Sequence, residues 1–555
     1  MRTFGALVIL GLSIVGPASA SEDVADLLLH HGVIYTVERG RVEGSIAVRG
    51  GRIVYVGPDA GAESLRGPRT RVIELGGRAV LPGLIDSHSH LAELGRVASE
   101  VDLRSAASFA EVVRRVAEAA RRAPAGAWVR GFGWDQTRWP GRQFPTHDEL
   151  SAAVPDHPVW LARVDGHAAL VNRRAMDAVG ISAATPDPAG GRYLRDAHGA
   201  PTGVLVDNAK DEIERRLPAP TVAELRQRIV RGAELCLAVG LTAVTDMGVD
   251  GETLAVYAAL RERGELPIRV AAFVADSPAL LAEWMARGPR LDPEARFEVR
   301  GVKLYADGAL GSRGAALLEP YSDDPANLGL QVSTEDHMAE VAKRALGAGF
   351  QVGIHAIGDR GALLALDAME TALGGPRPDA RFRLEHAQVM RLQDIGRLAS
   401  LGIIAAMQPT HATSDMRWAE ERVGPRRLEG AYAWRRMLDA GARLALGSDF
   451  PVESPDPRLG LYAAVSRQDL AGNPPGGWRP DQKLSREEAL RGFTLDAAYS
   501  VFWERELGSI VVGKRADLVV FGRDPMTVAE REIPQAEVDY TVLDGRIVHS
   551  REGVR

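Results

Sequence analysis

Short apolar runs alternate with amphipathic stretches through the middle of the chain. Each run is rich in aliphatic or β-branched residues and ends in glycine, alanine, proline or a polar residue, as a buried strand does. Strands that alternate with helical stretches predict parallel βα units and an α/β fold. Eight such units favour a (β/α)8 (TIM) barrel, and a doubly wound open sheet is the alternative. The expected strands lie near 80–88, 242–247, 267–274, 299–306, 350–356, 381–386, 402–408 and 443–449.

Both ends of the chain have a different pattern, in which short apolar runs are joined by tight glycine turns. Gly50-Gly51 and Asp544-Gly545 are typical of hairpin turns between strands. We therefore expect a small β-sandwich built from residues 21–79 and 501–555, around a barrel at 80–500. His30 and His31 fall in this sandwich and are interpreted as exposed or structural residues.

The interval between the first two barrel strands is too long for one helix and a loop. We expect an inserted subdomain at about 100–230, over the barrel mouth. Long loops on that face shape the substrate site of many barrels, although a structural elaboration with its own minor core would fit equally. The interval contains four of the nine tryptophans, which are Trp128, Trp134, Trp139 and Trp160.

The first twenty residues have the pattern of a secretory signal peptide. A positive start at Arg2 is followed by a short apolar stretch and by Ala18-Ser19-Ala20. The pattern predicts cleavage after Ala20 and a periplasmic or secreted mature chain with no stable membrane span. A retained N-terminal anchor is the alternative.

Composition narrows the class of site further. The formal charge of −7 is mild and no basic stripe is present, so nucleic-acid binding has no support. The only cysteine, Cys236, lies in an apolar helix-like run and is expected to be a buried small hydrophobe. A metal site in this chain would therefore use imidazole and oxygen ligands. The sequence does not specify the oligomeric state, and a homo-oligomer is possible.

Candidate metal ligands stand where the apolar runs end. His88 and His90 are two residues apart, so a strand would point both to the same face. Each of four later apolar runs ends in one further candidate ligand. Because the C-terminal strand ends of a barrel meet on one face, these residues form a constellation. Its members are His88, His90, Lys303, His355, His386 and Asp449.

Four motifs identify a family resemblance. Residues 81–90, 303–313, 447–453 and 508–519 resemble the metal-dependent amidohydrolase superfamily, and within it the group that includes N-substituted formamide deformylase and YtcJ-like proteins. The resemblance covers nearly the whole mature chain. It does not specify the substrate.

The resemblance implies a site with two divalent metal ions, with zinc as the first expectation and iron or manganese as alternatives. His88 and His90 would bind the first ion with Asp449, and His355 and His386 the second. Lys303 would bridge them as an N-carboxylated lysine, through a carbamate made from carbon dioxide. Read from the residues alone, Lys303 could instead form a salt bridge to Asp307 or Asp449 in a one-metal site.

The expected activity is hydrolysis of a small-molecule amide-type C–N bond other than a peptide bond. We hypothesise a metal-activated hydroxide as nucleophile, with Asp449 as general base and then general acid. Lactonase and phosphotriesterase activities remain open because the same site serves those bonds. A deaminase is less consistent, because family deaminases typically lack a bridging lysine and carry His-x-x-Glu after the fifth strand, where residues 356–359 of this chain contain no Glu. A secreted non-catalytic metal-binding protein is the alternative of another class.

Substrate contacts are expected from residues that follow the strands or lie in the insertion. Trp134 would be an apolar wall, and His411 would bind a carbonyl or oxyanion. For three of these residues a structural role was weighed as an alternative: Arg313 as a loop-closing ion pair, and Asp165 and His167 as a loop-stabilising pair. The expected set is Trp134, Asp165, His167, Asp307, Arg313 and His411.

Overall fold

The computed structural model describes residues 24–553. The expected signal peptide, residues 1–20, lies outside the described residues. Within the described part of the chain, none of the helices combines the length and the apolar character needed to cross a bilayer.

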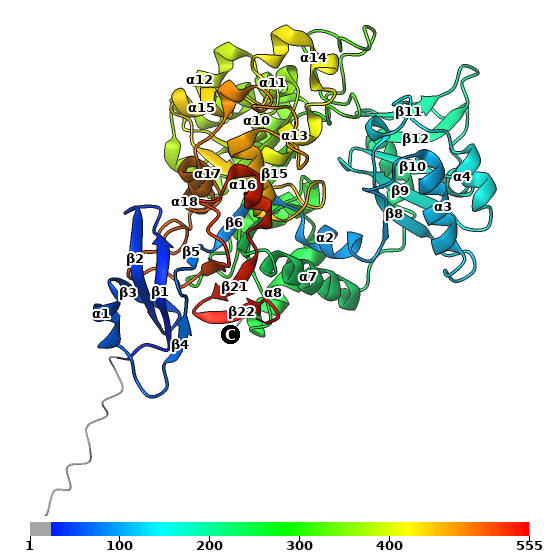
Figure 1. Cartoon of the computed structure of the whole chain (residues 1–555). Coiled ribbons are helices and arrows are strands. Elements are labelled where there is room, and N and C mark those ends of the chain that lie inside the picture. Colours follow the sequence, from blue (N-terminus) through cyan, green and yellow to red (C-terminus); the bar gives the residue numbers. More distant parts are fainter. Residues whose placement is uncertain (1–23, 554–555) are drawn as a thin grey trace, which may run out of the picture.

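Eight parallel strands form the central sheet in strict chain order (Figure 1). A bridge between Ser89 and Phe450 joins the first strand to the segment after the last, and the Asp449 N–H donates to the His88 carbonyl at 2.8 Å. Sequential order with closure is the (β/α)8 arrangement, so the predicted barrel is confirmed and the doubly wound sheet is wrong. The strands are β6 (Leu84–Ser89), β13 (Leu241–Val249), β14 (Arg269–Val274), β15 (Phe297–Tyr305), β16 (Gln351–Ala356), β17 (Arg383–His386), β18 (Ile404–Met407) and β19 (Leu444–Leu446).

Amphipathic helices cover the outside of this barrel. In α11 (Asp359–Leu373), Ala362, Leu366 and Met369 recur at helical spacing and are fully or almost fully buried in the main core. The other covering helices include α7 (Val222–Leu237), α8 (Gly251–Glu262), α9 (Pro278–Arg287), α10 (Glu335–Gly347) and α12 (Leu392–Leu401). Cys236 is buried in α7 among these apolar residues, as expected.

The first expected strand, 80–88, is in fact two strands in two different sheets. β5 (Ala79–Pro82) pairs with strands of both chain ends, and β6 begins the barrel. Pro82 has no N–H to continue a ladder. Gly83 passes so close to the barrel that a Cβ there would lie 2.3 Å from Thr242 Oγ1. The Pro-Gly pair therefore moves the chain from one sheet to the other, a role that apolar periodicity alone does not reveal.

The two chain ends form one mixed eight-stranded sheet, which we call the β domain. β5 lies at its middle, between β1 of the N-terminal part and β20 of the C-terminal part. A buried ion pair joins this domain to the barrel, with Arg269 Nε 2.6 Å from Asp517 Oδ2. The strands are β1 (Leu27–Tyr35), β2 (Arg41–Arg49), β3 (Arg52–Gly57), β4 (Arg71–Glu74), β5, β20 (Leu518–Phe521), β21 (Val538–Leu543) and β22 (Arg546–Ser550).

The segment between β6 and β13 forms a separate lobe beside the barrel mouth (Figure 1). It has a six-stranded sheet and its own apolar core, which includes Trp134 and Trp139. The expected insertion is too long at its C-terminal end, because α7 already packs in the barrel core. The strands are β7 (Val101–Asp102), β8 (Val129–Trp134), β9 (Val159–Arg163), β10 (Ala168–Val171), β11 (Gly191–Arg195) and β12 (Pro201–Asp207).

Candidate metal centre

The six predicted ligands meet at the C-terminal face of the barrel. Nitrogen or carboxylate atoms of His88, His386 and Asp449 all lie within 4.8 Å of one another. The ring of His386 lies 4.6 Å from the rings of both His88 and His355, measured between centroids. His90 Nε2 is 3.2 Å from Asp449 Oδ1, and Lys303 Nζ is 3.3 Å from His88 Nε2. All six except His90 are buried.

Glu385 and Arg383 hold the His88 ring in place. Glu385 Oε2 lies 2.6 Å from His88 Nδ1, which leaves Nε2 facing the other ligands. Arg383 in turn donates to both carboxylate oxygens of Glu385, at 2.8 and 3.0 Å. A carboxylate on the distal nitrogen fixes the orientation and tautomer of a metal-binding imidazole and increases its basicity.

The other histidines are oriented by neutral acceptors. His386 Nδ1 lies 2.8 Å from Gln408 Oε1, and His90 Nδ1 lies 3.1 Å from the Met247 carbonyl oxygen. Each ring that donates from Nδ1 keeps a lone pair on Nε2. In His355 it is Nε2 that lies near a carbonyl, 3.4 Å from the Gly308 oxygen.

Electrostatics favour neutral imidazoles at three of the four histidines and a charged carboxylate, whereas the Asp449 carboxylate outweighs burial and raises the pKa of His90. Burial holds the pKa values of His88, His355 and His386 well below their usual value, so these rings keep their lone pairs at neutral pH. Burial alone would raise the pKa of Asp449, but the neighbouring histidines outweigh it and hold that pKa below its usual range. Neutral imidazoles and an ionised carboxylate are the forms that bind metal ions.

Lys303 is fully enclosed at the centre of this group. Burial lowers the pKa of Lys303 to about 8, and its Nζ lies 5.0 Å from the centre of the Tyr305 ring. Across residues 24–553, no ion pair joins Lys303 to Asp307 or to Asp449, so the simple salt-bridge alternative is not observed. An amine that readily loses its proton is the form that reacts with carbon dioxide.

These side chains fit a divalent metal of the zinc type. Their donors are imidazole nitrogens and a carboxylate oxygen on converging strands, and the distal nitrogens of His88, His90 and His386 are already hydrogen-bonded. His411 Nε2 is buried without a hydrogen-bond partner among the described residues, 3.8 Å from Asp449 Oδ2.

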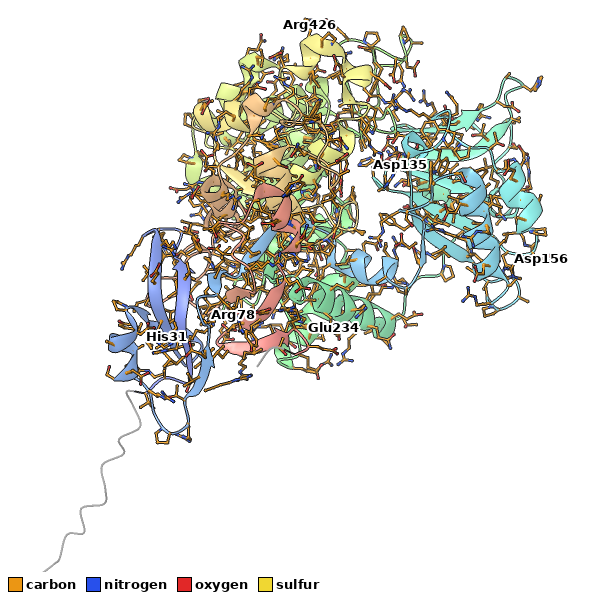
Figure 2. All side chains as sticks on the ribbon, viewed as in Figure 1. His31, Arg78, Asp135, Asp156, Glu234 and Arg426 are labelled. Carbon is orange, nitrogen blue, oxygen red and sulfur yellow. The ribbon has the colours of Figure 1, made fainter. Side chains whose placement is uncertain are left out.

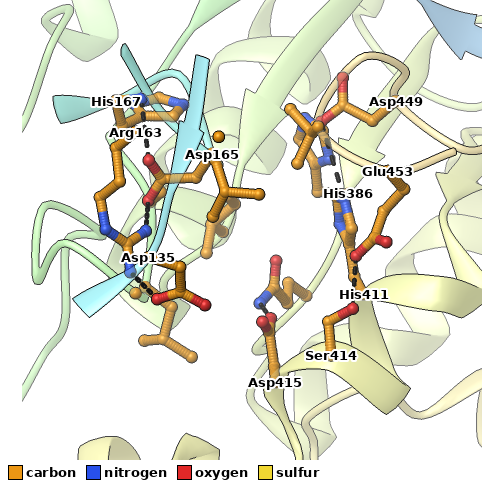
Figure 3. Close-up of a pocket in the computed structure, with 18 of the residues that line it drawn as sticks. Asp135, Arg163, Asp165, His167, His386, His411, Ser414, Asp415, Asp449 and Glu453 are labelled. Carbon is orange, nitrogen blue, oxygen red and sulfur yellow. Dashed lines mark hydrogen bonds and ion pairs between the residues drawn. The ribbon is translucent and has the colours of Figure 1, made fainter. Parts of the chain in front are cut away.

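Three of the expected substrate contacts line the cavities beside this cluster. His167 lies just before β10, and its ring centroid is 5.1 Å from that of His355. Its Nδ1 is 2.7 Å from Asp207 Oδ1. Arg163 Nη1 donates a hydrogen bond to Asp165 Oδ2 at 2.5 Å. Figure 3 shows these insertion residues on one side of the cavity and His386, His411 and Asp449 on the other.

The other three expected contacts have structural roles instead. Trp134 is fully buried in the insertion core, where its Nε1 donates to the Leu161 carbonyl at 2.8 Å. Asp307 is fully buried and accepts three backbone N–H groups, from Ala316, Ile357 and Gly358. Arg313 forms an ion pair with Asp323 at 3.0 Å. For Arg313 this is the loop-closing ion pair given as the alternative. Trp134 and Asp307 were wrong as substrate contacts because neither a place in the insertion nor a place after a strand reveals which way a side chain points.

Two cavities open beside the cluster, and His167 lines both of them. The smaller, of about 260 Å³, lies between the insertion and the loops after β17, β18 and β19. The larger, of about 840 Å³, lies between the insertion and helices α2 (Leu91–Val97) and α7, and reaches His88, His90 and Lys303. His355, His386 and Asp449 border both cavities. A substrate that spans both would therefore pass over the cluster.

Several residues of the site were not anticipated. The signal for Arg383 and Glu385 was present, because two charged residues flank Leu384 in an otherwise buried strand and so point into the barrel interior. Gln408, Asp415 and Glu453 had no such signal. Asp415 and Glu453 line the smaller cavity, where burial raises the pKa of Asp415 to about 7.

Substitution of Glu385 by glutamine is expected to weaken metal binding and turnover by about 10–100-fold, because His88 loses its orienting charge. Competition with a fluorescent chelator measures the affinity. Glu504→Gln is the matched control, since Glu504 pairs with Arg381 outside the cluster. Wild-type metal affinity in Glu385→Gln would remove the positioning role from Glu385.

Comparison with known proteins gives an independent assignment. The model of the Amidohydrolase family matches residues 71–549. The chain is 32% identical to YtcJ of Bacillus subtilis (strain 168), covering 94% of this chain and 99% of that protein. It is 30% identical to N-substituted formamide deformylase of Arthrobacter pascens, covering 95% and 99%.

A solved structure agrees with this result. The crystal structure of an uncharacterized metal-dependent hydrolase from Pyrococcus horikoshii superposes with a TM-score of 0.74 at 30% identity, covering 91% of this chain and 99% of that one. Together with the barrel and the ligand cluster, these matches show that the chain belongs to the amidohydrolase family of metal-dependent hydrolases.

Proposed function

We propose that this hydrolase cleaves an amide-type C–N bond of a small molecule, other than a peptide bond. The observation that carries the proposal is the cluster itself, in which three neutral imidazoles and Asp449 surround a buried Lys303 at the barrel mouth. The name of the Arthrobacter relative, a deformylase of N-substituted formamides, supports the bond type.

Two divalent ions, zinc being the first choice, would be held by this cluster. His88, His90 and Asp449 would hold one ion and His355 and His386 the other, and Lys303 would contribute to both as a carbamate. Bound ions of this kind lower the pKa of water and polarise a carbonyl oxygen.

Asp449 would carry the proton in this reaction. It follows β19 at the mouth and borders both cavities. Its neighbours keep it ionised, so it can accept a proton from the attacking water and return it to the departing nitrogen. The balance is one amide and one water giving one carboxylic acid and one amine.

His411 would bind the carbonyl oxygen of the substrate. It lies on α13 (Pro409–Asp415), with its ring 5.9 Å from that of His386, between centroids. Its Nε2 has no hydrogen-bond partner in the described chain, so a substrate oxygen would satisfy it. Donors aimed at the developing negative charge stabilise the transition state of acyl transfer.

A substrate screen tests the proposed bond. Zinc-replete protein is assayed against N-formyl, N-acyl and cyclic amides, lactones and phosphotriesters, with Asp449→Asn as the blank. We expect amide-type substrates to give the highest kcat/KM. Turnover confined to lactones or phosphotriesters would contradict the assignment of a C–N bond as the substrate bond. It would leave the proposal of a metal centre unaffected.

A further inference from the structure

A second group of imidazoles and carboxylates lies in the β domain, on the far side of the barrel from the insertion (Figure 2). Three potential ligand atoms, one from each of His30, His31 and Asp59, lie within 4.8 Å of one another. The two histidine rings are in contact, with centroids 3.9 Å apart and the two Nδ1 atoms 3.0 Å apart.

The backbone brings these neighbouring rings together. Successive residues of a strand normally point to opposite faces. In β1 the pairing with β2 shifts between Leu29 and Gly32, and His31 has a φ of 57°, in the left-handed region. This bulge turns the two rings toward one another. A non-glycine residue in that region is unusual and is often found at functional sites.

Three carboxylates surround the pair. His31 Nδ1 lies 2.8 Å from Glu74 Oε1, at the end of β4, and His30 Nε2 lies 3.2 Å from Glu63 Oε1. Asp59, at the start of α1 (Asp59–Glu63), accepts from the Ser45 hydroxyl and the His31 N–H and so is held toward the rings.

One nitrogen in this group has no hydrogen-bond partner. The His30 side chain is nine-tenths buried, with 10% of its surface exposed. Its Nε2 is buried and makes no hydrogen bond within residues 24–553. The group that faces this nitrogen is the Glu63 carboxylate, 3.2 Å away, so an acidic side chain lies against the Nε2 edge of the pair as well.

We propose that His30, His31 and Glu74, with Asp59 beside them, bind a divalent transition metal ion of the zinc class through the two Nδ1 atoms, which the Glu74 carboxylate oxygens approach to 2.8 and 3.8 Å. Two imidazole nitrogens bound to one ion at 2.0–2.1 Å lie about 2.9–3.4 Å apart, which agrees with the observed 3.0 Å between the Nδ1 atoms. The ion would join β1, α1 and β4 and so stabilise the β domain. This site is independent of the centre at the barrel mouth.

His31→Asn tests the proposal, because asparagine tolerates the left-handed backbone but removes one ligand. The full-length protein is saturated with Zn²⁺, passed through a desalting column and analysed for metal. We expect the variant to hold one equivalent fewer than the wild type. His198→Asn, an exposed histidine of the insertion, is the matched control and should match the wild type.

Thermal unfolding distinguishes a metal site from a cluster in which the histidines only form ion pairs with the carboxylates. A metal site predicts that Zn²⁺ raises Tm more in the wild type than in His31→Asn, and that the metal-free variant is at least as stable as the metal-free wild type. Equal zinc content in the two proteins would overturn the proposal. A second result would also overturn it: a lower Tm of the metal-free variant together with the same zinc-induced rise in Tm as the wild type. The histidines would then act only as ion-pair partners.

Discussion

Asp449→Asn is expected to lower kcat at least about 10³-fold, equivalent to about 4 kcal/mol in the activation barrier, while the chain remains folded. Asparagine has the size and shape of aspartate, so the packing after β19 is preserved. It cannot accept the proton of the attacking water, and it removes the negative charge that lies 3.2 Å from His90 Nε2. Steady-state kinetics at saturating zinc, with circular dichroism and Tm as checks of folding, measure the effect.

Asp367→Asn is the control for this experiment, because Asp367 pairs with Arg397 on the outer helices and does not approach the cluster. Its kcat should equal that of the wild type. If Asp449→Asn retained wild-type turnover, the assignment of Asp449 as the proton carrier would be lost, whatever its effect on metal content.

Lys303→Ala is expected to have an effect of similar size, with kcat reduced by about 10³-fold or more, because the variant lacks the proposed bridging carbamate. The side chain is fully buried, so its removal leaves a cavity at the centre of the cluster. Acetate or propionate can enter that cavity and replace the missing carboxylate. We therefore expect these acids to restore part of the activity in a concentration-dependent manner.

The wild-type protein offers a direct readout of the same proposal. After exchange with ¹³C-bicarbonate, a carbamate carbon resonance should be present in the wild type and absent from Lys303→Ala. Lys303→Arg is the charge-preserving control and should be as inactive as the alanine variant. Rescue by arginine, or the lack of a carbamate signal in metal-replete wild type, would favour a site in which Lys303 acts only as a cation.

The barrel and the order of its ligands could be predicted because both depend on local patterns. Most barrel strands contain a short apolar run, and each candidate ligand stands near or just after the C-terminal end of a strand. The rule that parallel strands meet at a common face then converts separate positions such as His88 and His386 into one cluster. The structure places all six residues together without exception.

The predictions failed where an outcome depends on how distant segments meet. His88 lies on the first barrel strand and Glu385 on the sixth, and closure of the sheet brings them to 2.6 Å. Trp134 looked like a site residue because it lies in the insertion, but the sheet of the lobe encloses it. The interpretation of His30 and His31 as exposed or structural residues stands, but their ring contact could not be predicted, because a bulge leaves no mark in the apolar period.

The position of β5 has a consequence for biosynthesis. β5 lies between β1 and β20 in the finished sheet, so its edge toward β20 stays unpaired until the segment from Gly83 to Asp517 has left the ribosome. At about 5–20 residues per second this delay lasts tens of seconds. Unpaired strand edges associate readily with other chains. We therefore expect nascent or C-terminally truncated chains to aggregate or to recruit chaperones through Ala79–Pro82, even when the barrel is complete.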